Sequence, residues 1–242
     1  MDGIDGMTAV ITGATSGIGR SIAHALATKG VNLCLIGRNQ KELECLEDEL
    51  KNKEINIRIY ICELGLIEDI ERTADEIIKN NTRVDILVHS AGSIIIRDFE
   101  TITVDEFDLQ YFVNTRAPFL ITQLLLPRIR SQKGQIIFIN SSASKQKARA
   151  SFSAYTASKY ALVAIADSLR EEVNAHGVRV LSIYPGRTAT AMQEEIHKTE
   201  KKKYQPDLLL QPDDVAQCVV SALLMPRTAE ITDISVRPFK KS

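Results

Sequence analysis

The stretch TGATSGIGR, residues 12–20, holds three glycines directly after a short β-branched run. A glycine-rich turn that follows a strand and opens a helix presents backbone N–H groups and the positive end of the helix dipole, which together can receive a pyrophosphate. Gly13, Gly17 and Gly19 would allow close approach of the backbone and tight packing of the helix on the strand. The stretch therefore predicts the first βαβ unit of a nucleotide-binding fold, in preference to a purely structural turn.

Strand-like and helix-like segments alternate along the rest of the chain. The strand-like runs are residues 9–12, 31–37, 55–62, 84–92, 134–142, 178–186 and 230–236. Amphipathic helical patterns lie between them, for example over residues 39–53 and 66–80. Such alternation predicts an α/β class protein, a doubly wound Rossmann fold whose seven-stranded parallel sheet has helices on both faces. We expect one domain over residues 1–242, in which the irregular residues 187–211 form a substrate lid.

Composition excludes several classes of function. A chain of 242 residues with a formal net charge of -1 gives no electrostatic reason to expect nucleic acid or an acidic membrane as a partner. No apolar run approaches the roughly 20 residues of a membrane span, and no signal peptide is visible. The four scattered cysteines, Cys34, Cys45, Cys62 and Cys218, have no metal-ligand spacing and suggest reduced thiols in the cytoplasm. We expect residues 1–6 to be a loose leader.

The end of the second strand, LIGRNQ at residues 35–40, bears on the choice of nucleotide. An acidic side chain there would bind an adenosine ribose and repel a 2′-phosphate. This chain instead has Gly37 followed by Arg38, whose guanidinium suits a phosphate, although a solvated arginine is the alternative. The pattern favours NADP(H) over NAD(H). Ser16 and Asn39 could add hydrogen bonds, and Asn39 is also a plausible N-cap.

Further motifs follow in a fixed order over nearly the whole chain. They are TGATSGIG (12–19), HSAG (89–92), VNTRAPF (113–119), INSS (139–142), YTASK (155–159), YPGRTAT (184–190) and SVRP (235–238). In this order and spacing the chain resembles the short-chain dehydrogenase/reductase family, in its compact, NADP(H)-preferring, single-domain branch. The resemblance implies four catalytic residues. Tyr155 would be the general acid/base, Lys159 would lower its pKa and hold the nicotinamide ribose, Ser142 would bind the substrate oxygen, and Asn114 would position a water molecule.

The chemistry of these residues agrees with that assignment. Tyr155 and Lys159 lie four residues apart, on one face of a helix. A free tyrosine has a pKa of about 10, and a nearby ammonium and the positive nicotinamide ring would lower it. The substrate oxygen gains charge as hydride arrives, so it needs donors from Tyr155 and Ser142. Ser141 is adjacent, but the spacing of thirteen residues to Tyr155 favours Ser142.

The resemblance also implies the residues that bind the cofactor. They are Gly13, Thr15, Ser16, Gly17, Ile18, Gly19, Arg38, Asn39, Glu63, Leu64, Ser90, Ala91, Gly92, Tyr155, Lys159, Pro185, Gly186, Thr188 and Thr190. His89 and Ser90 replace two asparagines that are usual in the family, so we expect weaker bracing of the fourth strand. We interpret His89 as structural and not as a catalytic base. Glu63 replaces an aspartate that touches the adenine amino group.

Basic residues gather after the predicted fifth strand. Lys145, Lys147 and Arg149, with Arg187, could attract an anionic carbonyl substrate or an acyl-carrier thioester. A solvated, flexible surface loop is the other interpretation and is slightly favoured. A solvated face is also the favoured interpretation of the lid lysines, which are Lys198, Lys201, Lys202 and Lys203.

Two long helical segments, residues 104–129 and 152–175, are more apolar than one sheet-facing stripe requires. The resemblance implies that they pair with a second copy, giving a homodimer or homotetramer, unless the extra leucines only pack beneath the sheet. We predict an NADPH-dependent carbonyl reductase, reversible as an alcohol dehydrogenase, that acts on a small ketone, aldehyde or hydroxy compound. The alternatives are a 3-oxoacyl-thioester reductase and a non-catalytic NADP-binding scaffold or sensor.

Overall fold

The computed structural model describes residues 3–239, which contain one sheet of seven parallel strands. In chain order the strands are β1 (Thr8–Thr12), β2 (Asn32–Gly37), β3 (Ile57–Ile61), β4 (Ile86–His89), β5 (Gln135–Ile139), β6 (Arg179–Pro185) and β7 (Asp233–Val236). Their order across the sheet is β3-β2-β1-β4-β5-β6-β7, and every neighbouring pair is parallel. The predicted α/β Rossmann fold is confirmed.

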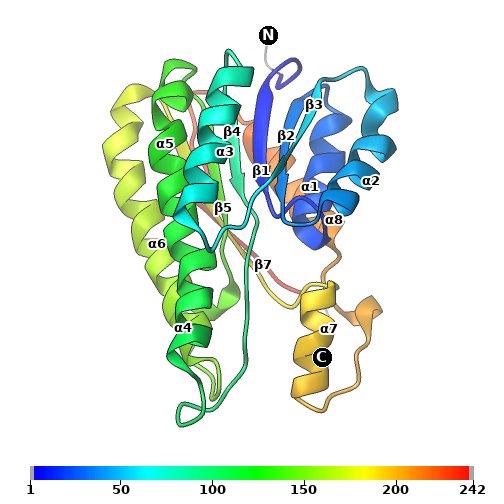
Figure 1. The fold of residues 1–242 in the computed structure, drawn as a ribbon, viewed down its shortest axis with the longest axis vertical. Coiled ribbons are helices and arrows are strands. Elements are labelled where there is room, and N and C mark those ends of the chain that lie inside the picture. The colour runs from blue at the N-terminus through cyan, green and yellow to red at the C-terminus, as the bar shows by residue number, and fades with distance from the viewer. Residues whose placement is uncertain (1–2, 240–242) are drawn as a thin grey trace.

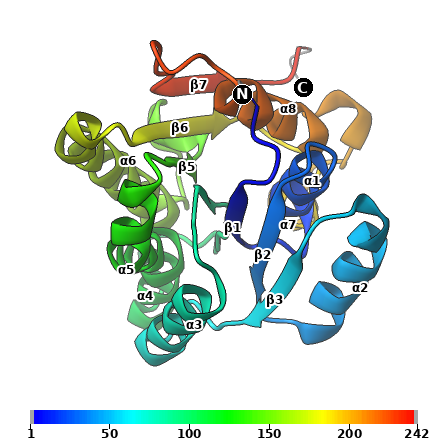
Figure 2. The same ribbon diagram turned by 90° about the horizontal axis from the view of Figure 1, so that it is seen from above.

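Helices cover both faces of the sheet, as Figure 2 shows. They are α1 (Gly17–Ala27), α2 (Gln40–Leu50), α3 (Ile67–Asn80), α4 (Val104–Tyr111), α5 (Ala117–Ser131), α6 (Ser153–Val173), α7 (Ala191–Thr199) and α8 (Pro212–Leu223). One layer holds α1, α2 and α8, and the other holds α3 to α6. Figure 1 shows α7 apart from both layers, beyond one end of the sheet. No helix within residues 3–239 is long and apolar enough to cross a bilayer.

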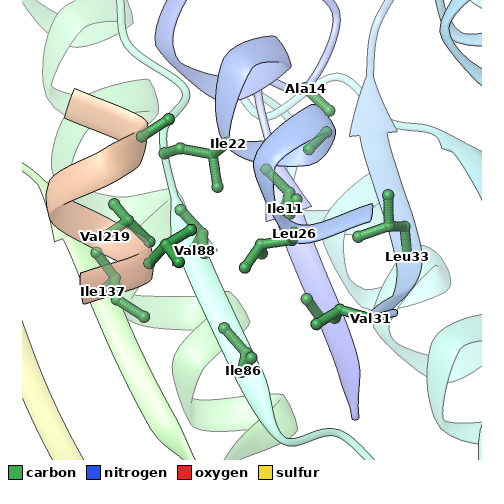
Figure 3. Close-up of a cluster of buried hydrophobic side chains, with 14 of the residues drawn as sticks. Ile11, Ala14, Ile22, Leu26, Val31, Leu33, Ile86, Val88, Ile137 and Val219 are labelled. Carbon is green, nitrogen blue, oxygen red and sulfur yellow. The ribbon is translucent and has the colours of Figure 1, made fainter. Parts of the chain in front are cut away.

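Each face of the sheet has its own apolar cluster, because successive side chains of a strand point to opposite faces. Ile11 of β1 packs in the cluster beneath α1 and α8, together with Leu26 and Val219 (Figure 3). Its neighbour Val10 joins the cluster on the other face, with Leu125 of α5. Burial on both faces explains why the strands read as continuous apolar runs and not as alternating ones.

The structure changes three expected segments. The predicted helix over residues 104–129 is α4 and α5 joined by a π turn, Phe112–Arg116, and the predicted helix over 152–175 is α6. The predicted loose leader is wrong for its described part, because Ile4 is buried and the Gly6 N–H donates to the Gly30 carbonyl at 2.9 Å. Residues 1 and 2 of that leader lie outside the described residues.

The segment after β6, predicted as an irregular lid, contains regular structure. It holds α7 and a short 3-10 turn, Pro206–Leu208, and it returns to its own start where Thr188 pairs with Leu210 in a parallel bridge. The N-cap of α7 is Thr190, whose hydroxyl accepts a hydrogen bond from the Gln193 N–H at 3.2 Å. The segment is therefore an anchored helical loop.

Between β1 and β4 the connections leave for opposite faces of the sheet, which opens a crevice at the carboxyl ends of the strands. Thr12, the last residue of β1, closes the base of this crevice. Its hydroxyl oxygen accepts hydrogen bonds from the backbone N–H groups of Ser90 and Ala91, at 3.2 and 3.3 Å. The glycine turn and the loop after β4 are held together at the position where a ligand is expected.

Candidate active site

A cleft of about 800 Å³ lies at the carboxyl ends of the strands and is lined by residues from the loops that follow all seven strands. The predicted cofactor-binding residues that line it are Gly13, Thr15, Ser16, Gly17, Ile18, Gly19, Arg38, Glu63, Leu64, Ser90, Ala91, Gly92, Tyr155, Lys159, Pro185, Gly186, Thr188 and Thr190. Predicted residues far apart in the sequence therefore meet in one cleft. Asn39 and Asn114 are the two predicted site residues that do not line it.

The glycine turn is closed to larger side chains by the backbone around it. Gly13 has φ +66°, and a Cβ there would lie 2.7 Å from the Cα of Ala91. A Cβ on Gly19 would collide with the Gly13 carbonyl oxygen. Gly17 has φ +51°, and a Cβ there would lie 2.9 Å from Cγ2 of Thr190, a residue of the lid. Because these positions carry no side chain, a ligand can approach the N-terminus of α1.

Arg38 occupies the far end of the cleft, with its side chain 76% exposed. One guanidinium nitrogen lies 3.7 Å from Oε2 of Glu63, so the arginine is only loosely paired and can turn toward an anion. At Gly37, a Cβ would lie 2.7 Å from Cγ2 of Thr15. Asn39 is the N-cap of α2, as predicted, and its side-chain oxygen accepts from the N–H of Lys41 at 3.0 Å.

Tyr155 is half-buried in the first turn of α6 and lines the cleft. Burial raises the pKa of its phenol, and a hydrogen bond with Ser141 opposes that rise. Ser141 and the predicted Ser142 both line the same cleft as Tyr155. Ser141 follows β5 and caps a 3-10 turn, Ser142–Ser144, by accepting from the Ala143 N–H at 3.1 Å.

Lys159 is buried one helical turn after Tyr155. Its ammonium donates a hydrogen bond to the carbonyl oxygen of Ile139, at the end of β5, at 3.1 Å. Burial lowers the pKa of Lys159 to about 8. We expected Lys159 to lower the pKa of Tyr155, but the protein's own groups leave the tyrosine pKa raised. A lowered tyrosine pKa would therefore need the positive charge of a bound ligand in addition to the chain.

Asn114 lies in the π turn between α4 and α5, a kind of distortion that often marks functional sites. Its side-chain oxygen accepts from the Ser93 N–H at 2.7 Å, and its amide donates to the Ser93 carbonyl at 2.8 Å and to the Ser158 hydroxyl at 3.0 Å. The Ser158 hydroxyl in turn donates to the Tyr155 carbonyl at 2.8 Å. The structure thus gives Asn114 a positioning role that joins the loop after β4 to the helix of Tyr155.

His89 has the structural role expected of it. Its ring stacks on Phe138 with centroids 4.9 Å apart, and Nε2 lies 2.8 Å from the Thr122 hydroxyl. Burial lowers the pKa of His89 to about 3, so the imidazole is neutral near pH 7. The next residue, Ser90, has a buried hydroxyl with no hydrogen-bond partner among the described residues. As expected, the serine side chain braces this strand end weakly.

The basic loop is exposed to solvent, in agreement with the favoured interpretation, although Lys145 and Arg149 have acidic partners. Arg149 contacts Glu200 of the lid at 2.5 Å, and Lys145 lies 3.4 Å from Asp233. Arg187 also contacts Glu200, at 2.8 Å. No spacing rule pointed to Glu200, because its partners come from two other loops. Lys198 does pair on the exposed lid face, with Glu194 and Glu195.

The described residues hold no group of three His, Cys, Asp or Glu side chains that could bind a metal ion. The four cysteines are free thiols, and Cys34 and Cys62 are buried among apolar side chains.

Comparisons with known proteins agree with this architecture. The family model described as short chain dehydrogenase matches residues 7–201. An uncharacterised oxidoreductase of Staphylococcus aureus (strain USA300) is 31% identical over 234 residues, covering 95% of this chain and 96% of the relative. These matches span the glycine turn, the tyrosine helix and the lid.

Solved structures share the fold along almost the whole chain. A metagenomic short-chain oxidoreductase in complex with NADP is 30% identical with a TM-score of 0.85, covering 98% of this chain and 99% of that one. An alcohol dehydrogenase from the archaeon Thermococcus sibiricus, complexed with 5-hydroxy-NADP, has a TM-score of 0.89 at 23% identity, over 98% and 99% of the two chains. The chain therefore belongs to the short-chain dehydrogenase/reductase family.

Proposed function

We propose that this protein is a single-domain, NADP(H)-dependent oxidoreductase that interconverts a carbonyl compound and its alcohol. The observation that carries the proposal is the meeting of Tyr155, Ser141 and Lys159 in the same cleft as the glycine turn. The metagenomic relative, 30% identical, was crystallised with NADP. A tyrosine, a serine and a buried lysine around one cleft fit proton transfer to a substrate oxygen.

The cleft fits the cofactor by its shape and its donors. The turn at Gly13, Gly17 and Gly19, which larger side chains would obstruct, would hold the pyrophosphate, and Arg38 would hold a 2′-phosphate. Thr190 stands beside this turn at the start of the lid. When bound, NADPH supplies a hydride.

The chain's own residues would handle the proton and the developing charge. As the substrate carbon accepts hydride, its oxygen takes the phenolic proton of Tyr155, and the product is the alcohol. Ser141 donates a hydrogen bond to the same oxygen. Lys159 supplies a positive charge that stabilises the phenolate left on Tyr155. Asn114 keeps the loop after β4 against the tyrosine helix.

The test is NADPH oxidation with a panel of ketones, aldehydes and 3-oxoacyl thioesters, the last being the alternative substrates. We expect at least one class of compound to be reduced, which is measured as a loss of NADPH absorbance. In the reverse direction, we expect the corresponding alcohol to be oxidised with NADP⁺. If NADPH bound tightly and no compound on the panel reacted, a non-catalytic scaffold or sensor would be the better interpretation.

Removing the Arg38 guanidinium should change the cofactor preference. We expect Arg38→Leu to lower kcat/KM with NADPH by about 10–100-fold, since a hydrogen-bonded charge pair contributes about 1.5–3 kcal/mol. Activity with NADH should not fall, because it has no 2′-phosphate. The measurement is kcat/KM with each cofactor at fixed substrate, and an equal fall with both cofactors would contradict the assignment.

The two adjacent serines should differ in effect. We expect Ser141→Ala to lower kcat by about 10²–10³-fold, the effect of losing one donor to the charged oxygen. Ser142→Ala should have a smaller effect, because Ser141 is the serine that opposes the rise in the pKa of Tyr155. Steady-state kinetics give kcat for both variants. A larger fall in kcat for Ser142→Ala than for Ser141→Ala would favour Ser142, the serine predicted from the spacing.

We also propose that the protein forms a homodimer or homotetramer through the face made by α4, α5 and α6. Large apolar side chains on these helices are 39–73% exposed, namely Val104, Phe107, Tyr111, Phe119 and Tyr160. Burial of this face against a second copy would remove them from water. Light scattering after size exclusion measures the assembly, and a monomer at micromolar concentration would contradict it.

A cytoplasmic location is part of the same proposal. The free thiols of Cys34 and Cys62 suit a reducing compartment, and burial raises the pKa of Cys34 to about 12, so it stays protonated. Cell fractionation followed by immunoblotting tests the location, and recovery outside the cytoplasm would contradict it.

A further inference from the structure

The part of the cleft between the loop after β5 and the lid combines apolar walls with positive charge. Its apolar residues are Ile94, Leu109, Val113, Phe152, Met192 and Ile196. Three cations line it as well: Lys147, Arg149 and Arg187. Within residues 3–239, Glu63 is the only acidic side chain that lines the cleft, and it lies beside Arg38 at the other end.

Arg149 and Arg187 are fixed in place although they come from different loops. Both contact the carboxylate of Glu200, Arg149 at 2.5 Å and Arg187 at 3.0 and 2.8 Å to its two oxygens. Lys202 is a third partner of Glu200, at 3.1 Å. The Glu200 side chain is only 10% exposed. Two guanidinium groups therefore meet around one shielded carboxylate.

This cluster keeps a surplus of positive charge. Three cations, Arg149, Arg187 and Lys202, surround the single negative charge of Glu200, which leaves a net charge of +2. These cations hold the pKa of Glu200 down at about 2, against the effect of its burial, so it stays ionised near neutral pH. Each guanidinium has five N–H donors, and the contacts to Glu200 use only part of them. The remaining donors can bind a second anion.

The cluster also contacts the start of the helix that carries Tyr155. The Arg149 guanidinium stacks on the ring of Phe152, 4.6 Å from its centroid. Phe152 precedes Tyr155 by three residues, which is about one helical turn. An anionic group held by the arginines would thus be separated from the Tyr155 phenol by a short apolar stretch.

We infer that the carbonyl substrate carries a carboxylate, which Arg149 and Arg187 bind while Glu200 acts as the positioning residue for both guanidinium groups. This inference rests on the proposed function and narrows its substrate class to oxo acids with a short hydrocarbon segment. Bidentate binding of carboxylates is characteristic of arginine, and apolar walls strengthen the field of the two charges.

The test compares oxo acids with their methyl esters, which keep the carbonyl group and lose the negative charge. The probes are 4-oxopentanoate and 5-oxohexanoate and their esters, each with NADPH. For the wild-type protein we expect kcat/KM to favour the acids by about 10–100-fold, mainly through KM, as charged hydrogen bonds allow. Equal use of acid and ester, or preference for the ester, would overturn the inference while leaving the proposed function intact.

Variants of the two arginines test whether these residues cause the preference for the acid over the ester. Arg149→Gln and Arg187→Gln should each lower the acid-to-ester ratio by tenfold or more, and Arg187→Lys, which keeps the charge, should restore part of it. Lys198→Gln removes the same charge from the exposed lid face and should leave the ratio unchanged. Arginine variants that kept the wild-type ratio would overturn the inference, whereas failure of every acid and ester to react would count against the proposed function itself.

The variant Glu200→Gln distinguishes a positioning role of Glu200 from a purely electrostatic role. The variant adds one unit of positive charge to the cluster, so a purely electrostatic role predicts a larger acid-to-ester ratio. A positioning role predicts a smaller ratio and a higher KM for the acids, because the two guanidinium groups are no longer held together. An increased ratio would overturn the role given to Glu200.

Discussion

Replacing Tyr155 with phenylalanine should lower kcat by about 10²–10⁴-fold, the usual contribution of a positioned general acid. The phenol is the group in the cleft that can give a proton to the substrate oxygen, and phenylalanine keeps its ring without its hydroxyl. NADPH affinity should change little, because the glycine turn and Arg38 are untouched. Stopped-flow binding and steady-state turnover measure the two effects separately.

Tyr160 is the matched control for this experiment. It lies on the same helix, is 48% exposed and does not line the cleft, and its hydroxyl donates to the carbonyl of the cleft residue Gln146 at 3.2 Å. Tyr160→Phe should retain activity. An equal loss of activity in both variants would contradict the role of Tyr155.

The pKa of Tyr155 also predicts a pH dependence. Because burial raises this pKa, the phenol is protonated near neutral pH. Alcohol oxidation needs the phenolate, so its rate should increase as the pH rises.

Lys159→Met should remove activity and yet stabilise the fold. The variant loses the cation that stabilises the phenolate, so kcat should fall by about 10²-fold or more. Burial shifts the lysine pKa from 10.5 to about 8, which corresponds to about 3 kcal/mol of unfavourable free energy at neutral pH. The lost hydrogen bond to Ile139 offsets about 1 kcal/mol of that, so the variant should be about 1–3 kcal/mol more stable without cofactor.

The pH dependence identifies the cause of this stabilisation. Between pH 8 and 10.5 the unfolded chain binds the lysine proton more tightly than the folded chain does, so the wild-type stability contributed by Lys159 rises with pH. The advantage of Lys159→Met should therefore shrink from pH 7 to pH 10. Denaturant unfolding of both proteins at these two pH values measures it. If the variant were less stable than the wild type at pH 7, the buried ammonium would not destabilise the folded protein as expected.

Much of the fold was predictable, because strands buried on both faces and helices with one apolar stripe leave different periodicities. The glycine turn was predictable because close backbone contacts require its glycines: a Cβ on Gly19 would meet the Gly13 carbonyl, and a Cβ on Gly13 would meet Ala91 of the loop after β4. The sequence predicted the correct tyrosine and lysine for the cleft, since the two lie on one helix and helical geometry fixes their relation.

The errors share a physical origin, in that they depend on loop geometry. The choice between Ser141 and Ser142 depends on the 3-10 turn Ser142–Ser144, which the spacing of residues does not reveal. The helix over residues 104–129 was predicted as continuous, because a π turn leaves little trace in the apolar pattern. Glu200 was missed because its partners, Arg149 and Arg187, are brought to it only by tertiary structure.

The contacts of Glu200 also limit how the loops around the cleft can be exchanged between relatives. Arg149 of the loop after β5 reaches Glu200 of the lid, and Ser151 of the same loop donates to Asp98 of the loop after β4, at 2.5 Å. Three loops that are separate in sequence are thus one connected unit. A graft that transplants the lid alone would leave Arg149 without its carboxylate, so new specificities in this scaffold call for all three loops to be inherited together.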